Sequence, residues 1–100
     1  MKQRRKNMDK LKAAAESAGL LKALGNSKRL EIVFILREGE RKVGELEKII
    51  GISQSALSQH LAVLRTAGIV STRRDAQSVF YSLSDERCRR LLDLLEKLSD

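Results

Sequence analysis

The chain has 100 residues, a formal net charge of +7, a single cysteine and no proline. This length predicts one small domain with a modest core, for which oligomerisation is a common remedy. The single cysteine excludes an intrachain disulfide and a cysteine-based metal cluster. No stretch resembles a signal peptide, and no apolar run approaches the ~18 residues of a membrane span, so we expect a cytoplasmic protein.

Most of the positive charge lies near the N-terminus. Residues 1–12 carry six basic residues and one acidic residue, which is +5 of the total of +7. A basic arm suits nucleic acid or another anionic surface, but it equally suits a disordered segment that keeps the chain in solution. We expect residues 1–8 to form a disordered basic arm and residues 9–98 to form the folded domain, and charge alone identifies no partner.

Two helices are predicted in the first part of the domain. Residues 9–24 form the first, which Gly25 can end in the left-handed conformation. Asn26 is the expected N-cap of a second helix over residues 27–38, which is apolar nearly all round and therefore central to the core. The first helix carries a face of mostly small side chains, which favours close helix packing: Leu11, Ala14, Ala15, Ala18 and Leu21.

The next two helices have the helix-turn-helix pattern. Residues 43–50 predict a short helix that ends at Gly51, with three residues facing inward: Val43, Leu46 and Ile49. Ser53 is the expected N-cap of the following helix, which begins with "SQSALSQHL" over residues 53–61. Two short helices joined by a turn that contains glycine are typical of a helix-turn-helix.

The second of these helices carries an unusual outer face. Leu57, Leu61 and Leu64 form one narrow apolar stripe. The opposite face is small, neutral and mostly able to hydrogen bond: Ser55, Ser58, Gln59 and Ala62. A surface helix that serves only solubility usually carries lysine and glutamate instead.

After Gly68 the apolar period changes from 3.6 to 2. Residues 69–74 and 78–83 predict two strands. Their connection near residues 74–77 lacks an Asn-Gly or Asp-Gly signal, so we expect a loop of four residues or more. Ser84 or Asp85 then caps a last helix with a wide apolar stripe: Cys88, Leu91, Leu92, Leu94, Leu95 and Leu98. The sequence predicts a mainly α fold with a small β-hairpin, a winged helix-turn-helix with an extra helix at each end.

In this order the motifs resemble the ArsR family of bacterial winged-helix repressors, and within it the HlyU/NolR-like branch. The resemblance covers roughly residues 18–98 and rests on "LKALGNSKRLEIVFIL", on the stretch from "VGELEKII" to "VFYSLS", and on the leucine-rich last helix. It implies a homodimer joined through the first and last helices, with one recognition helix for each half of a palindromic double-stranded DNA operator. The implied dimer residues are Leu11, Ala14, Ala18, Leu21, Leu91, Leu94, Leu95 and Leu98.

The residue chemistry agrees with a DNA-binding role. Gln54 and Gln59 carry amides that can pair with an adenine edge, and small neighbours permit close approach to the major groove. Serines at the start of the helix can reach phosphates or bases, and a helix N-terminus itself attracts phosphate. The candidate DNA contacts are Ser53, Gln54, Ser55, Ser58, Gln59, His60 and Arg65 on the recognition helix, with Arg73, Arg74 and Gln77 at the wing.

The ligands of the family's metal sensors are missing. The "VGELEKII" stretch has no cysteine, and the last helix has acidic residues but no histidine. Soft divalent metals need several nitrogen or sulfur ligands at close range, and His60 is the single histidine of the chain. We therefore expect no metal site and no cofactor, and we interpret His60 as a packing or phosphate-contacting residue.

Three alternative roles are a redox-responsive regulator, an enzyme and a protein-interaction module, and each would need different residues. Cys88 shares a face with leucines and is interpreted as a core residue, although Arg87, Arg89 and the helix N-terminus could lower its pKa and make it a redox-responsive thiol. No phosphate-binding loop or supported Ser/His/Asp arrangement is present, so we expect no enzyme. A winged helix that serves only as a protein-interaction module would show an apolar outer face on the recognition helix.

Overall fold

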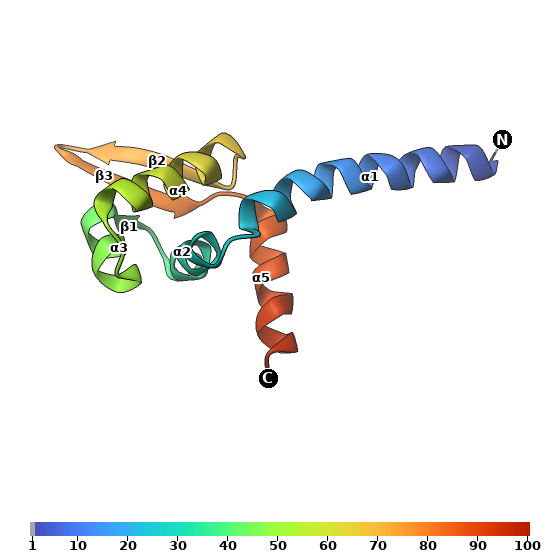
Figure 1. Cartoon of the computed structure of the whole chain (residues 1–100). Helices are drawn as coiled ribbons and strands as arrows, with labels where there is room; N and C mark the ends of the chain where they lie inside the picture. The colour runs from blue at the N-terminus through green and yellow to red at the C-terminus, as the bar shows by residue number, and fades with distance from the viewer. Residues whose placement is uncertain (1) are drawn as a thin grey trace.

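The computed structural model describes residues 2–100 and has the predicted winged helix-turn-helix architecture. In chain order the elements are α1 (Lys2–Leu24), α2 (Ser27–Glu38), β1 (Arg41–Lys42), α3 (Val43–Ile50), α4 (Gln54–Thr66), β2 (Val70–Asp75), β3 (Ser78–Leu83) and α5 (Glu86–Leu98). Helices α2 to α4 and the β2–β3 hairpin form the body, while α1 and α5 leave it in two different directions (Figure 1). Within residues 2–100, none of the helices is both long and apolar enough to span a bilayer.

The core is built from the predicted apolar stripes. The three leucines of α4, Leu57, Leu61 and Leu64, are buried as expected. They belong to one cluster with Ile32, Val33 and Leu36 of α2, Leu46 of α3, Ile69, and Leu92 of α5. Burial of a leucine side chain contributes about 1.5–3 kcal/mol, so this cluster fixes how α4 sits on the body.

Side-chain caps begin three of the helices where the sequence predicts them. The Asn26 side-chain oxygen accepts hydrogen bonds from the backbone N–H groups of Lys28 and Arg29, at 3.0 and 3.1 Å. Ser53 Oγ accepts from the N–H of Ala56 at 3.2 Å. Of the two candidates for α5, the cap is Asp85. These caps satisfy N–H groups that have no partner within the helix.

Replacement of Asp85 should destabilise the chain. Asp85 Oδ1 accepts from the N–H groups of Arg87 and Cys88, at 2.8 and 3.3 Å, and the Arg87 guanidinium pairs with the same carboxylate. The Arg87 hydrogen bond and these N–H groups hold the pKa of Asp85 below its ordinary value. We expect Asp85→Ala to lower the free energy of unfolding by about 1–2 kcal/mol at pH 7, as measured by urea denaturation.

The same substitution should matter less in acid. Because the pKa of Asp85 is lower in the folded chain than in the unfolded chain, its stabilisation is present above the unfolded value and is lost as the pH falls through the folded value. Glu86→Ala is the matched control, since Glu86 is exposed and does not cap the helix. An equal loss at pH 7 and at about pH 2.5 would contradict a role for the Asp85 charge.

The sheet has one strand more than the sequence predicts. Its order is β1-β3-β2, and both pairings are antiparallel. The added strand, β1, contains only Arg41 and Lys42, which pair with Tyr81 and Phe80 of β3. Two residues are too short to show an alternating apolar pattern, so this strand leaves no signal in the sequence.

The expected loop of four or more residues at the tip of the hairpin is wrong. Asp75 pairs with Ser78, so the turn contains only Ala76 and Gln77. Ala76 adopts a positive φ of 57°, the backbone region that tight two-residue hairpin turns require and that glycine or asparagine usually supplies. The paired strands therefore impose this turn without the usual turn residues.

Two further local expectations are corrected. Ile49 is 51% exposed, and Ile50 packs against the core instead. The reason is spacing, because Val43, Leu46 and Ile50 recur along the face of α3 that meets the body.

Gly25 follows α1 without a positive φ, so the expected left-handed end of this helix is wrong. A Cβ at this position would lie 3.1 Å from a backbone carbonyl of the preceding turn, so the site favours a residue without a side chain.

Residues 2–8 are helical and continue α1 away from the body, in contrast to the disordered arm that we expected (Figure 1). This segment contains neither glycine nor proline and consists mainly of good helix formers. The Gln3 side chain also donates to Asn7 Oδ1 at 3.3 Å, one helical turn later. Residue 1 of the expected arm lies outside the described residues.

Candidate nucleic-acid interface

Helix α4 presents the predicted polar face to solvent. Ser53, Gln54, Ser55, Ser58 and Gln59 are all exposed, while the leucines of the opposite face are buried. The structure therefore brings these predicted contacts together on one surface that carries no acidic side chain. Small hydroxyl and amide groups there can approach base edges and phosphates closely.

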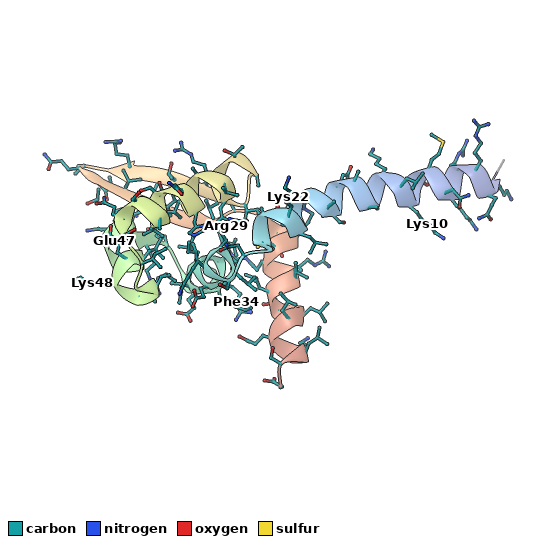
Figure 2. The ribbon with its side chains drawn as sticks, viewed as in Figure 1. Lys10, Lys22, Arg29, Phe34, Glu47 and Lys48 are labelled. Atoms are coloured by element: carbon teal, nitrogen blue, oxygen red, sulfur yellow. The ribbon has the colours of Figure 1, made fainter. Side chains whose placement is uncertain are left out.

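His60 lies on the flank of α4 and is half-buried. Its Nδ1 is 3.5 Å from Nη1 of Arg29 on α2, the residue labelled in Figure 2. Arg29 Nε also donates to the backbone carbonyl of Ala23 at the end of α1. Arg29 thus connects the end of α1 to α4. This arginine is absent from the predicted site residues. The sequence does not single it out, because α2 also contains the cations Lys28 and Arg37.

The three predicted wing residues have different surroundings. Arg74 and Gln77 are exposed at and beside the tip of the hairpin. Arg73 is instead held by Glu40, with 2.9 Å between Arg73 Nε and Glu40 Oε2, and its guanidinium lies 4.3 Å from the ring centroid of Phe80. The hydrogen bonds from Arg73 hold the pKa of Glu40 below its ordinary value. Arg65, the remaining predicted cation, is exposed in the last turn of α4.

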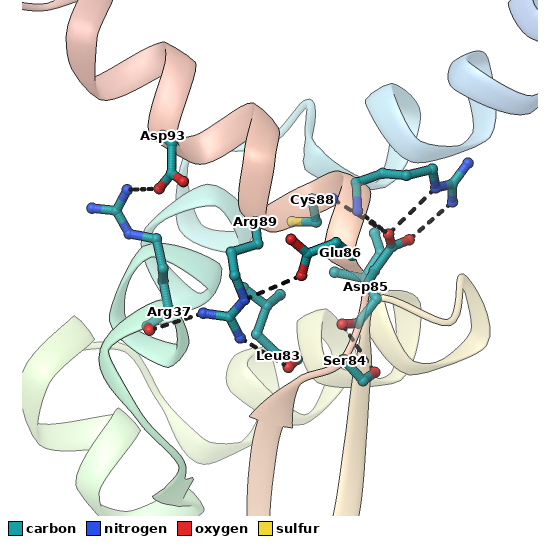
Figure 3. A network of polar contacts seen from close by, with 10 residues as sticks. Arg37, Leu83, Ser84, Asp85, Glu86, Cys88, Arg89 and Asp93 are labelled. Carbon is teal, nitrogen blue, oxygen red and sulfur yellow. Dashed lines mark hydrogen bonds and ion pairs between the residues drawn. The ribbon is translucent and has the colours of Figure 1, made fainter.

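Polar contacts attach α5 to the body (Figure 3). Arg37 of α2 pairs with Asp93 at 2.9 Å and with Glu96 at 2.5 Å. Arg89 of α5 donates to the backbone carbonyls of Arg37 and Leu83, at 3.2 and 3.3 Å. The direction of α5 is therefore fixed relative to α2 and to the end of the hairpin.

The expected dimer residues divide into two groups. Leu91 and Leu95 are half-buried and pack against the core of their own chain. The others are exposed in this single chain: Leu11, Ala14, Ala18, Leu21, Leu94 and Leu98. Large apolar side chains therefore remain uncovered on both of the helices that leave the body.

Cys88 is a core residue. The side chain is fully buried, and burial, together with the nearby Asp85 carboxylate, raises the pKa of the thiol to about 11. Arg87 and Arg89 act in the opposite direction but are outweighed. A regulatory thiol needs exposure and a lowered pKa, and Cys88 has neither feature in this structure.

Metal ligands are not gathered anywhere in the part of the chain that the structure describes. Within residues 2–100 no group of three or more histidine, cysteine, aspartate or glutamate side chains could hold a metal ion. Independence from metal stays a prediction from the sequence.

Comparison with known proteins identifies the family. Residues 26–72 match the family model described as "Bacterial regulatory protein, arsR family". The chain is 48% identical over 87 residues to the transcriptional activator HlyU of Vibrio cholerae, a match that covers 87% of this chain and 81% of that protein. The chain belongs to the ArsR family. It is also 49% identical over 87 residues to a biofilm growth-associated repressor of Xylella fastidiosa, over 87% of this chain and 76% of that protein.

Solved structures agree with this assignment. Reduced HlyU from Vibrio cholerae has a TM-score of 0.86 and 47% identity, and the match covers 90% of this chain and 95% of that one. A winged helix-turn-helix domain of Mb0332 from Mycobacterium bovis, described as homodimeric and DNA-binding, has a TM-score of 0.80 and 31% identity over 91% and 84% of the two chains. The expected family, branch and fold are confirmed, and this ArsR-family chain is a transcriptional regulator.

Proposed function

We propose that this ArsR-family regulator binds a palindromic double-stranded DNA operator as a homodimer in the cytoplasm and represses transcription by occupying that site. The observation that carries the proposal is the exposed face of α4, which offers serine and glutamine side chains and no acid. Arg74 and Gln77 at the wing and Arg65 at the end of α4 add groups that can hold phosphates.

Dimerisation is supported by the uncovered leucines of α1 and α5. Leu21 and Leu94 are each more than half exposed in the single chain, and Leu11 and Leu98 are exposed further still. A small domain gains stability by covering such side chains with a second copy. The Mycobacterium bovis domain of the same fold is described as homodimeric.

The protein-interaction alternative receives less support. It requires an apolar outer face on α4, and the exposed large apolar residue of that helix is Val63 alone. A catalytic role has no support either, because the family consists of regulators and Cys88, the chain's one thiol, is buried with a raised pKa.

Selection of bound duplexes from a random pool tests the proposal. We expect enrichment of an imperfect palindrome whose half-sites lie about one helical turn apart, with affinity that falls steeply as salt rises. Ser58→Glu should abolish this binding because it places an acid on the α4 face. Ser27→Glu is the control, since the first turn of α2 tolerates an acid. Equal affinity for selected and random DNA at ~150 mM salt would contradict the proposal.

A further inference from the structure

The outer surface of the sheet carries a row of side chains that crosses all three strands. Lys42 of β1, Phe80 of β3 and Arg73 of β2 are neighbours in the strand register. Both cations lie over the Phe80 ring, with Arg73 Cζ at 4.3 Å and Lys42 Nζ at 5.4 Å from its centroid. Glu40, in the connection between α2 and β1, reaches this row through Arg73.

Glu40 holds Arg73 with both of its carboxylate oxygens. The Arg73 Nε–Glu40 Oε2 distance is 2.9 Å, and the Arg73 Nη2–Glu40 Oε1 distance is 2.5 Å. Asp75 adds a looser contact, with its Oδ2 at 3.8 Å from Arg73 Nη1. A two-point pair with a carboxylate uses an N–H edge of the guanidinium, the same kind of edge that a phosphate binds.

We propose that Glu40 is a positioning residue of the wing, which keeps Arg73 on Phe80 and prevents its guanidinium from binding DNA phosphate. The inference rests on the proposed DNA binding and refines it. Arg73, expected from the sequence to contact DNA, then serves to anchor the hairpin. The cation that the wing offers to phosphate is Arg74, which makes no ion pair within residues 2–100.

The consequence concerns the sequence-independent part of binding. Each phosphate that the protein neutralises adds about 0.9 to the slope of log affinity against log salt. A paired Arg73 adds nothing to that slope, because Glu40 and not a DNA phosphate neutralises its charge, so that no condensed cation is released from the DNA. Glu40 therefore limits how tightly the dimer holds DNA of any sequence.

Salt titrations on a random-sequence duplex of ~25 base pairs test the assignment. We expect Glu40→Gln to strengthen binding by about 3- to 10-fold at ~150 mM salt and to steepen the slope by about one. Arg73→Gln alone should leave the salt slope unchanged. When Arg73 is already replaced by glutamine, the further change Glu40→Gln should not steepen the slope. Glu38→Gln is the matched control, because it removes an exposed acid two residues earlier whose partner is Arg41. Thermal unfolding confirms that each variant is folded.

Two results would overturn the inference. One is a slope reduced by about one unit in Arg73→Gln, which would show that Arg73 already binds phosphate in the unaltered protein. The other is a change in affinity and in salt slope that is no larger for Glu40→Gln than for Glu38→Gln. The proposed function is judged by a different readout, the preference of the unaltered protein for a selected palindrome, so its failure is distinguishable from failure here.

Discussion

Replacement of Leu94 by glutamate should convert the homodimer into folded monomers, with a dissociation constant raised about 100-fold or more. Leu94 is 52% exposed and Leu98 is 72% exposed, so neither side chain is needed for the core of its own chain. Covering a leucine contributes about 1.5–3 kcal/mol, and a two-fold interface contains each residue twice. A buried unpaired carboxylate adds a further cost.

Sedimentation of the variants at micromolar concentration measures this effect. Lys97→Glu is the matched control, because Lys97 is exposed on the polar side of α5. Leu95→Glu is less informative, since Leu95 packs against the core of its own chain and its loss would unfold the protomer. If the unaltered protein sediments as a folded monomer at micromolar concentration, the proposed dimer is wrong. If Leu94→Glu still associates like the unaltered protein, Leu94 does not lie in the dimer interface.

The sequence predicted best those features that depend on a repeating pattern within one element. Leu57, Leu61 and Leu64 recur on one side of α4, so their burial and the exposure of Ser58 and Gln59 follow from helix geometry. Caps were also predictable, because the acceptor and its N–H donors lie within three residues of each other. The α4 face could therefore be assembled from the sequence before its position on the body was known.

Contacts between distant residues could not be predicted in this way. Arg29 and His60 are 31 residues apart, and Glu40 and Arg73 are 33 apart. Whether a cation is paired or available depends on the direction of α2 relative to α4 and on β1, whose two residues show no pattern. The sequence therefore indicated three similar wing residues, whereas the structure separates Arg73 from Arg74 and Gln77.

Replacement of Gln59 by alanine and replacement of Arg74 by alanine should weaken DNA binding in different ways. A glutamine amide that pairs with an adenine edge carries sequence information. Gln59→Ala should therefore cost about 1–3 kcal/mol on the selected operator and little on random DNA. Arg74→Ala should weaken binding to both and reduce the salt slope by about one unit for each phosphate that the variant no longer neutralises.

A scan of single base-pair changes in the operator separates a base reader from a backbone contact. Relaxed preference at one position in each half-site marks a reader, whereas a uniform loss of affinity marks a phosphate contact. Gln54 stands in the first turn of α4, where its amide can reach either a base or a phosphate, and the same scan assigns it. Lys48→Ala on α3 is the control for removal of an exposed cation outside the wing. If neither glutamine variant changes preference at any position, sequence is read through DNA shape or through the wing, and the neutral face of α4 serves only to let the helix approach the groove.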